Sequence, residues 1–260
     1  MSKFFLCLAG LLTLFPFALN AQSARTPVLV ELFTSEGCSS CPPADRLLAA
    51  LDSRQPVSNA QIIVVEEHVD YWDGEGWRDR FSSSVYTNRQ SLYGPRLKFD
   101  SPYTPQMVVD GSFQFVGNDS SKAVSAITRA AELPKIPLDL SAPALEGKYL
   151  AGSVSTTSWL QLPRGDLYAA LVQLTASTEV KSGENGGRHL DHVSVARSLQ
   201  HIGRLQDLGN GPVAFKLNVP SELSAEHLRL IVFAQLPDQG AIRGIASAEP
   251  HPGATSQSKP

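Results

Sequence analysis

The sequence predicts an α/β domain with a mixed sheet and flanking helices, followed by an all-β, sandwich-like domain. In the first part of the chain strand-like and helix-like runs alternate, whereas the part after Pro134 contains short strand-like runs separated by glycine, proline and asparagine. The first pattern is typical of α/β folds and the second of β-sandwiches. Pro134, Pro137 and Pro143 mark the junction. We therefore expect the α/β domain at residues 22–133 and the sandwich at residues 134–249.

Residues 1–21 have the character of a secretory signal peptide. Lys3 precedes an apolar run from Phe4 to Leu19, and Ala21 is small enough to stand at a cleavage site. The run is too short for a membrane span, and no second long apolar segment follows, so an uncleaved anchor is the less favoured alternative. We expect a periplasmic or secreted protein with no membrane association after cleavage. Cys7 lies in the removed segment, which leaves two cysteines in the mature chain.

The mature chain shows no feature of a surface that binds nucleic acid or lipid. The formal net charge is -3, and charges of both signs are scattered along the sequence. Attraction of nucleic acid or lipid headgroups would need a basic stripe or a cationic face. We therefore expect neither partner. Residues 250–260 are small and polar, which predicts a disordered tail.

The first domain is predicted to begin with a strand, a helix and a second strand. Residues 28–33 form an almost continuous apolar run, which is typical of a central strand covered on both faces. Two consecutive prolines fit the first turn of the helix, which Ser39 or Ser40 can cap. Because a helix connects them, the two strands are expected to be parallel. The full prediction is strands at residues 28–33, 61–69, 106–109 and 113–116 and helices at residues 44–51, 84–93 and 120–133.

Turn residues define the predicted hairpins. Asp110-Gly111 separates the last two strands of the first domain, which predicts a tight antiparallel turn. In the second domain, residues 182–191 read as a wide, glycine-rich hairpin. We expect Glu184, Arg188 and His192 to hold its shape or brace it against the first domain. Seven strands are predicted there, at residues 136–140, 149–156, 167–174, 192–199, 213–219, 228–236 and 242–246.

Two cysteines two residues apart, at the start of a helix that follows a buried strand, indicate redox chemistry. The loop that Cys38 and Cys41 close is so short that cross-linking it contributes little to stability. The helix amino terminus favours a thiolate over a thiol, so Cys38 is the expected nucleophile, with an exposed sulfur. Cys41, one turn further on, is placed to resolve a mixed disulfide.

A proline that opens the third strand is the second element of the predicted site. We expect the Thr104-Pro105 bond to be cis, with an ordinary trans proline as the alternative. A cis Pro105 would bring the backbone beside it against the cysteines, offer hydrogen bonds to an extended peptide and keep metal ions from the thiols.

Several long strings in the chain carry a family resemblance. The order of elements, the Cys-Ser-Ser-Cys motif and the Thr104-Pro105 pair resemble the thioredoxin superfamily, which implies a thioredoxin-like first domain. Relative to thioredoxins, the cysteines enclose Ser39-Ser40 instead of Gly-Pro, and the segment of residues 70–100 is enlarged. More specifically, the chain resembles the DUF1223 family of secreted bacterial proteins. The strings concerned are Glu31 to Asp45, His68 to Asp73, Tyr103 to Gly111 and Gly183 to Arg188.

The buried position of Glu31 in an apolar strand has two interpretations. With one inserted residue, Glu31 resembles the buried acid of thioredoxins, which moves protons for the resolving cysteine. The alternative is a carboxylate paired with an arginine at the domain junction. His68 and Asp70 follow the second strand and are expected on the same edge of the sheet as the cysteines. A structural role is favoured for His68 over a role in catalysis or metal binding.

These features together predict an exported thiol–disulfide oxidoreductase that acts on protein thiols of the cell envelope. Cys38 attacks, Cys41 resolves, Glu31 assists proton transfer, and Pro105 shapes a groove for the substrate chain with Thr104, Tyr71 and Trp72. No prosthetic group is needed, but a separate redox partner protein must supply or accept electrons. Two alternatives stay open: metal binding or copper delivery through Cys38, Cys41 and His68, and a redox-inert binding module on the same scaffold.

Overall fold

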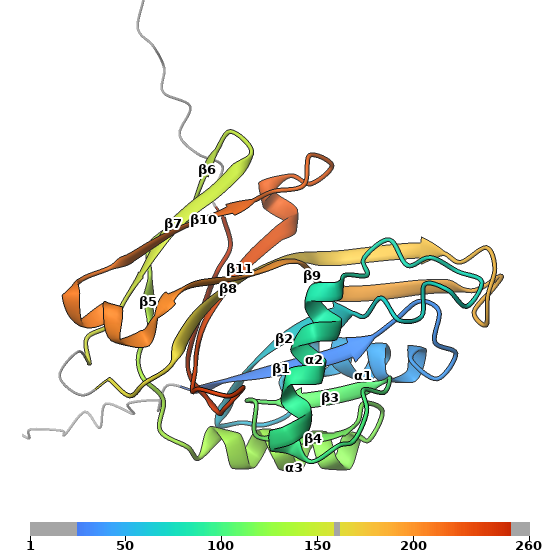
Figure 1. Cartoon of the computed structure of the whole chain (residues 1–260), viewed down its shortest axis with the longest axis horizontal. Coiled ribbons are helices and arrows are strands. Elements are labelled where there is room, and N and C mark those ends of the chain that lie inside the picture. The colour runs from blue at the N-terminus through green and yellow to red at the C-terminus, as the bar shows by residue number, and fades with distance from the viewer. Residues whose placement is uncertain (1–24, 159–161, 251–260) are drawn as a thin grey trace, which may run out of the picture.

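A computed structural model describes residues 25–158 and 162–250, so the predicted signal peptide and almost all of the predicted tail lie outside the described residues. The described residues contain three α-helices and twelve strands, and the strands form two sheets (Figure 1). The helices are α1 (Pro42–Arg54), α2 (Ser84–Leu97) and α3 (Ser120–Ala131). The strands are β1 (Thr26–Thr34), β2 (Ala60–His68), β3 (Gln106–Val109), β4 (Phe113–Val116), β5 (Asp139–Leu140), β6 (Ala144–Glu146), β7 (Tyr149–Ser155), β8 (Asp166–Glu179), β9 (His189–Arg204), β10 (Val213–Asn218), β11 (Leu228–Gln235) and β12 (Ile242–Ala248).

The predicted elements are present. β8, β9 and β12 are longer than predicted, β5 is reduced to two residues, and one short strand, β6, was not predicted. β1 and β2 are parallel as expected. Asp110 and Gly111 both have positive φ in the turn between β3 and β4, as a tight hairpin requires. The N-cap of α1 differs from the prediction. Cys41, and neither of the two serines, is the N-cap residue, and no side chain caps the helix.

A single mixed sheet of eight strands runs through both predicted domains, in the order β12-β11-β8-β9-β2-β1-β3-β4. The join is made where β2 and β9 pair in parallel, at Glu66 and Val195. The mixed sheet with flanking helices is therefore confirmed. The domain boundary at residues 133 and 134 stays a prediction, because a continuous sheet crosses it.

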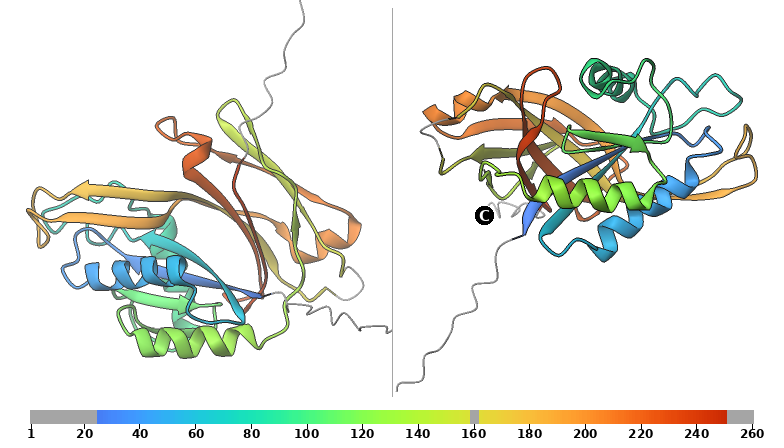
Figure 2. Two further views of the ribbon diagram at one scale, coloured as in Figure 1. Left: turned by 180° about the vertical axis from the view of Figure 1, so that it is seen from behind. Right: turned by 90° about the horizontal axis from the view of Figure 1, so that it is seen from below.

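The two faces of β1 bury different helices. Val28, Val30 and Leu32 pack with residues of α1 and α3, whereas Leu29 and Phe33 pack with residues of α2. The right panel of Figure 2 shows α1 and α3 on one side of the sheet and α2 on the other. This alternation follows from the two-residue period of a strand. It decides which polar side chains of β1 and β2 share the face of α1.

The second sheet covers the other half of the large sheet. It contains β10, β7 and β5, with β6 paired to β7. Leu150 and Val154 of β7 and Leu217 of β10 pack against Leu171 of β8 and Leu230 of β11 in one apolar core. Two layers with a shared core are therefore present in the second half of the chain.

The β8–β9 hairpin is the element that positions the candidate site. Its strands pair from Asp166 and Arg204 to Glu179 and His189. The hairpin projects beyond the end of β11 and lies along the first domain (Figure 1). Its tip, residues 180–188, thereby reaches the amino terminus of α1.

A buried ion pair ties the β3–β4 turn to the second half of the chain. The Asp110 carboxylate accepts a hydrogen bond from the Leu29 amide (2.9 Å) and pairs with the ammonium group of Lys135. Lys135 also donates to the Ile242 carbonyl oxygen of β12 (2.9 Å). Burial raises the pKa of Asp110 to about 6, although the charge of Lys135 acts in the opposite direction.

This raised pKa predicts a pH-dependent stability. The folded chain retains the Asp110 proton at a pH where the unfolded chain has lost it. The contribution of this carboxyl is therefore complete below about pH 4 and is lost by about pH 6, at a cost of about 2–3 kcal/mol. The free energy of unfolding in urea should decline over this range relative to an Asp110→Asn variant. A difference between the two proteins that stays constant over the same range would contradict the prediction.

Candidate functional site

The two cysteines form a disulfide at the amino terminus of α1. Their Cα atoms are 5.4 Å apart. The chain leaves β1 at Thr34 and turns tightly, with the Cys38 amide donating to the Ser35 carbonyl (3.1 Å) and the Cys41 amide to the Cys38 carbonyl (3.2 Å). Because Cys41 caps the helix, the pair lies beside its first amide groups, which favour a thiolate.

Both cysteines are buried, which corrects the expectation of an exposed Cys38 sulfur. Cys38 and Cys41 are each 0% exposed, whereas Ser39 and Ser40 between them are exposed. The burial of Cys38 was not predicted because its cover comes from the second half of the chain.

The cover is the tip of the β8–β9 hairpin, residues 180–188, which we call the hairpin cover. Its central contact is Asn185, whose side-chain amide donates to the carbonyl oxygens of Glu36 (2.8 Å) and Cys38 (2.9 Å). Glu184 accepts a hydrogen bond from the Ser39 amide (3.0 Å). Arg188 donates to the Asn185 side-chain oxygen (2.8 Å), so Arg188 holds the shape of the cover while Glu184 braces it. Both contacts agree with the predicted structural roles. Asn185, the residue that reaches Cys38, was missed.

Trp72 connects the cysteine loop to the predicted peptide groove. The Thr104-Pro105 bond is cis, and Gln106, the next residue, lies opposite Phe33 of β1. The indole nitrogen of Trp72 donates to the Thr104 hydroxyl (2.8 Å), and its Cβ would lie 3.2 Å from a side chain at Gly37. Thr104 and Trp72 therefore flank the loop that leads to Cys38.

Tyr71 lies next to the same threonine, whose hydroxyl interacts with the Tyr71 hydroxyl. The Tyr71 side chain is exposed, and its hydroxyl donates to the Gln90 side chain of α2 (3.3 Å). The structure thus brings Trp72 and Tyr71 together at Thr104, with the Tyr71 hydroxyl also bonded to α2.

Glu31 is paired with an arginine on the face of the sheet opposite to α1. Arg89 of α2 donates to one carboxylate oxygen (2.5 Å), and the Tyr93 hydroxyl donates to the other (2.7 Å). Arg89 also donates to Gln235 of β11 (3.1 Å), so the network crosses between the two predicted domains. The arginine-paired alternative therefore describes the structure. Proton transfer from Cys41 to Glu31 is not retained, because the sheet separates Glu31 from α1.

Asp45 occupies the position beside the cysteines that was expected for Glu31. It lies one turn after Cys41 on α1, its amide donates to the Cys41 carbonyl (3.1 Å), and its carboxylate accepts from the Thr34 hydroxyl (2.7 Å). Burial, with a smaller contribution from Glu66, raises the pKa of Asp45 to about 7. A carboxyl group with this pKa can exchange a proton near neutral pH.

A buried group of carboxylates and histidines surrounds Asp45 on the same face. His68 is held by Asp79 (Nδ1 to Oδ2, 2.6 Å) and His192 by Glu66 (Nδ1 to Oε1, 2.6 Å). Although burial disfavours the charged form, the Glu66 carboxylate raises the pKa of His192 to about 9. Glu66, Glu67 and His68 follow one another near the end of β2, and this run of polar residues in a buried strand was the signal in the sequence.

The alternative metal site of Cys38, Cys41 and His68 is not formed. Among the described residues, the side chains close enough to share one ion are Glu66, His68 and His192, and both cysteine sulfurs are joined in the disulfide. His68 does lie on the α1 face of the sheet, but its neighbours there are carboxylates and a second histidine.

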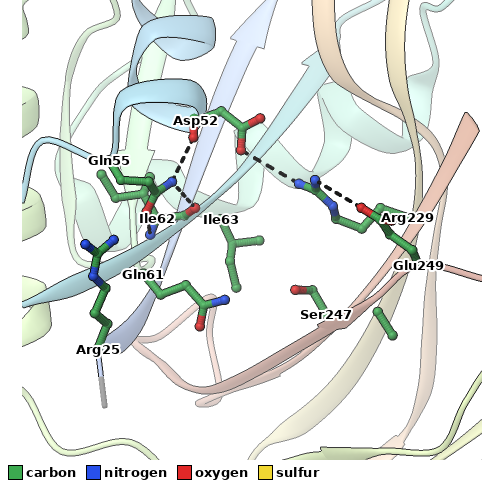
Figure 3. A pocket seen from close by; sticks show the side chains of 10 residues that line it. Arg25, Asp52, Gln55, Gln61, Ile62, Ile63, Arg229, Ser247 and Glu249 are labelled. Atoms are coloured by element: carbon green, nitrogen blue, oxygen red, sulfur yellow. Dashed lines mark hydrogen bonds and ion pairs between the residues drawn. The ribbon is translucent and has the colours of Figure 1, made fainter. Parts of the chain in front are cut away.

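A pocket of about 730 Å³ lies at the other end of α1 (Figure 3). Arg229 bridges Asp52 (3.7 Å) and Glu249 (3.8 Å) across it. Asp52 is near the carboxyl terminus of α1, whereas the disulfide is at the amino terminus, roughly 15 Å away at 1.5 Å per residue. This pocket is therefore not part of the cysteine site.

Among the described residues, α1, α2 and α3 all lack the length and apolar character that a membrane-spanning helix needs.

Comparisons with known proteins identify a family and solved relatives. The sequence profile described as Protein of unknown function (DUF1223) matches residues 29–235. Protein AGR_C_4864 from Agrobacterium tumefaciens is 24% identical, with a TM-score of 0.65 over 92% of this chain and 100% of that chain. HBP35 of Porphyromonas gingivalis is 12% identical, with a TM-score of 0.61 over 92% of this chain and 80% of that chain. At these identities the likeness shows the fold alone. No curated protein matches the sequence.

Proposed function

We propose, from the premise that this chain belongs to the DUF1223 family of proteins of unknown function, that it is a thiol–disulfide oxidoreductase of the cell envelope. The observation that carries the proposal is the Cys38–Cys41 disulfide at the amino terminus of α1, directly after a central strand. A two-residue spacing at a helix amino terminus lowers the pKa of the first thiol and places the second within reach. The signal-like residues 1–21 support export to the envelope.

The reaction follows from the roles of the two sulfurs. With the pair reduced, the Cys38 thiolate attacks a substrate disulfide, forms a mixed disulfide and releases one substrate thiolate. Cys41 loses its proton and attacks the Cys38 sulfur, which releases the second substrate thiolate and forms the Cys38–Cys41 disulfide. A separate redox partner then returns two electrons. In the opposite direction, one substrate thiolate attacks Cys38, forms a mixed disulfide and releases the Cys41 thiolate. A second substrate thiolate then attacks the mixed disulfide, so the substrate leaves as a disulfide and the cysteine pair is reduced.

Asp45 replaces Glu31 as the group that takes the proton of Cys41 in this proposal. It shares the face of α1 with the cysteines, it is one turn from Cys41, and its pKa of about 7 suits proton transfer at neutral pH. Glu31, on the other face, keeps a structural role.

Both cysteines are buried, and the hairpin cover is bonded to the backbone of the loop that carries Cys38, so substrate access in this proposal requires displacement of the cover. The contacts to be broken include two hydrogen bonds from Asn185, one to Glu184, one from the Ser182 hydroxyl to the Gly76 carbonyl (2.5 Å), and the packing of Gly183 beside Trp77. A substrate chain would then lie along Trp72, Thr104 and Pro105. Loops that gate access to a site commonly move in this way.

The second candidate is a redox-inert module, and the burial of both cysteines favours it. In that case the disulfide is a fixed structural link and the cover never opens. Metal delivery through the cysteines is less well supported, because His68 does not lie with them in a shared ligand group.

The two candidates differ in whether Cys38 exchanges with other proteins. A Cys41→Ser variant of residues 22–260 cannot resolve a mixed disulfide, so we expect envelope proteins to accumulate in disulfide linkage to Cys38. Mass spectrometry after acid quenching identifies them. A Cys38→Ser variant is the matched control and should trap none.

Absence of trapped proteins would favour the inert module only if other proteins can reach Cys38 beneath the hairpin cover. The same experiment is therefore repeated with Asn185→Ala added to Cys41→Ser. If Cys38 forms no mixed disulfide with any protein or with a small disulfide reagent such as oxidised glutathione in this second variant either, the oxidoreductase proposal is wrong.

A further inference from the structure

Three buried side chains lie close together where β2 and β9 meet: those of Glu66 and His68 on β2 and of His192 on β9. The atoms that face one another are His68 Nε2, Glu66 Oε1 and His192 Nδ1. His68 Nε2 lies 3.4 Å from Glu66 Oε1, and His192 Nδ1 lies 2.6 Å from the same oxygen. All three residues are fully buried or nearly so, and one ligand atom from each lies within 4.8 Å of the others. The 2.6 Å contact is a hydrogen bond and is shorter than the spacing of two ligands of one ion, so a bound ion would replace its proton and move these two atoms apart.

His68 Nε2 has no hydrogen-bond partner among the described residues, although its atom is buried. A buried polar atom without a partner destabilises the fold, so its presence calls for a physical reason. Glu66 Oε1 lies 3.4 Å from His68 Nε2, which is long for a hydrogen bond and close to the spacing between two ligands of one ion. Two ligands at 2.0–2.1 Å from a tetrahedral zinc ion are about 3.3 Å apart.

The outer nitrogen of each histidine faces a further carboxylate. His68 Nδ1 pairs with Asp79 Oδ2 at 2.6 Å, and His192 Nε2 lies 3.7 Å from Glu36 Oε1. A carboxylate behind a metal-bound histidine fixes the ring and raises its basicity as a ligand. The second oxygen of Glu66 is likewise held, by the Val193 amide (2.9 Å). His68 and Glu66 are thus oriented by hydrogen bonds, whereas His192 Nε2 faces Glu36 Oε1 without one, and both of these buried atoms have no hydrogen-bond partner among the described residues.

The charges and the surroundings fit a cation. Glu36, Glu66 and Asp79 place three carboxyl groups around two imidazoles in a region closed to solvent. The ring of Phe81 packs edge-on against His68 (5.2 Å between centroids) and closes one side. Buried carboxylates need compensating positive charge, and a divalent ion supplies it compactly.

We propose that His68, His192 and Glu66 form a binding site for a divalent transition metal ion of the zinc type, with Asp79 and Glu36 supporting the histidines. Two histidines and one carboxylate are a ligand set that zinc uses in proteins, with the fourth position left to water. The ligands come from β2 and β9, so a bound ion fastens β9, and with it the hairpin cover, to the first domain. The site contains no cysteine and does not depend on the redox function proposed above.

The test is metal content after folding in the presence of zinc. Because the site is buried, the chain of residues 22–260 is unfolded in urea with a chelator, refolded with or without ZnCl₂ and passed through a desalting column. We expect inductively coupled plasma mass spectrometry to find one zinc ion per chain. The thermal unfolding temperature should rise in the zinc-loaded protein.

Variants locate the ion. His68→Gln, His192→Gln and Glu66→Gln each remove one ligand and should reduce retained zinc at least 10-fold. Asp79→Asn keeps the ligands and should weaken affinity about 10- to 100-fold. His201→Gln is the matched control, since His201 is an exposed histidine of the same strand paired with Asp166. It should retain zinc, as should the Cys38→Ser/Cys41→Ser variant.

Cobalt substitution of the unaltered chain tests the site without relying on any variant. A Co²⁺ ion bound by nitrogen and oxygen should give visible absorption bands without the near-ultraviolet band of a cobalt–thiolate bond. Failure of the refolded native chain to retain either zinc or cobalt would overturn the proposal. Retention that is lost in the double cysteine variant but kept in His192→Gln would also overturn it and would place the ion at the cysteines.

Discussion

Replacement of Asn185 by alanine is expected to raise the rate at which reduced Cys38 is alkylated by roughly 10- to 100-fold. The Asn185 side chain donates two hydrogen bonds, to the carbonyl oxygens of Glu36 and Cys38, and both are lost in the variant. At about 0.5–1.5 kcal/mol each, their loss lowers the free energy of opening the hairpin cover by about 1–3 kcal/mol. The reactive, open population rises by the corresponding factor.

The measurement is the rate of iodoacetamide labelling at Cys38, followed by mass spectrometry under mild reductant. Lys181→Ala changes an exposed residue of the same hairpin cover and is the matched control. It should react at the rate of the unaltered chain. Equal rates for all three proteins would mean that the cover does not limit access to Cys38.

Loss of Arg89 is expected to cause the largest change in stability, a reduction of about 3–5 kcal/mol in the free energy of unfolding for Arg89→Met. Arg89 is buried, donates to Glu31 (2.5 Å) and lies 3.6 Å from Glu67. Arg89 supplies the positive charge for these carboxylates, so its removal leaves them buried without a counter-charge. Removal of one partner of a buried ion pair destabilises a protein more than removal of both partners.

Urea unfolding of the chain measures this change, and the double variant Glu31→Gln/Arg89→Met is its control. With both charges removed, the double variant should recover part of the lost stability. A single Arg89→Met variant that loses less than about 1 kcal/mol would show that Glu31 is not held as an ion pair.

The local structure followed from the sequence because the responsible signals are local. The apolar run at residues 28–33 predicts β1, and the Asp110-Gly111 turn predicts the β3–β4 hairpin, and both are present with nearly the predicted bounds. The Cys-x-x-Cys spacing likewise predicts a pair that can join, and it is joined in a disulfide.

The contacts that complete the site are long-range, and the sequence carries no rule for them. Glu66 of β2 meets His192 of β9, and Asn185 meets Cys38, because one strand of the second half inserts beside the first-half strands. A parallel pairing between strands so distant along the chain depends on the whole tertiary arrangement. The side of the sheet to which Glu31 points was predictable from strand periodicity, but the helix covering that side was not.

The central claim is that the Cys38–Cys41 bond opens and closes reversibly in the folded protein. Equilibration of residues 22–260 in a series of glutathione redox buffers, followed by acid quenching and mass-resolved thiol labelling, measures it most directly. The account predicts a single two-electron transition between dithiol and disulfide, with the chain folded on both sides of it. A pair that stays oxidised across the whole series until the chain unfolds would contradict the claim.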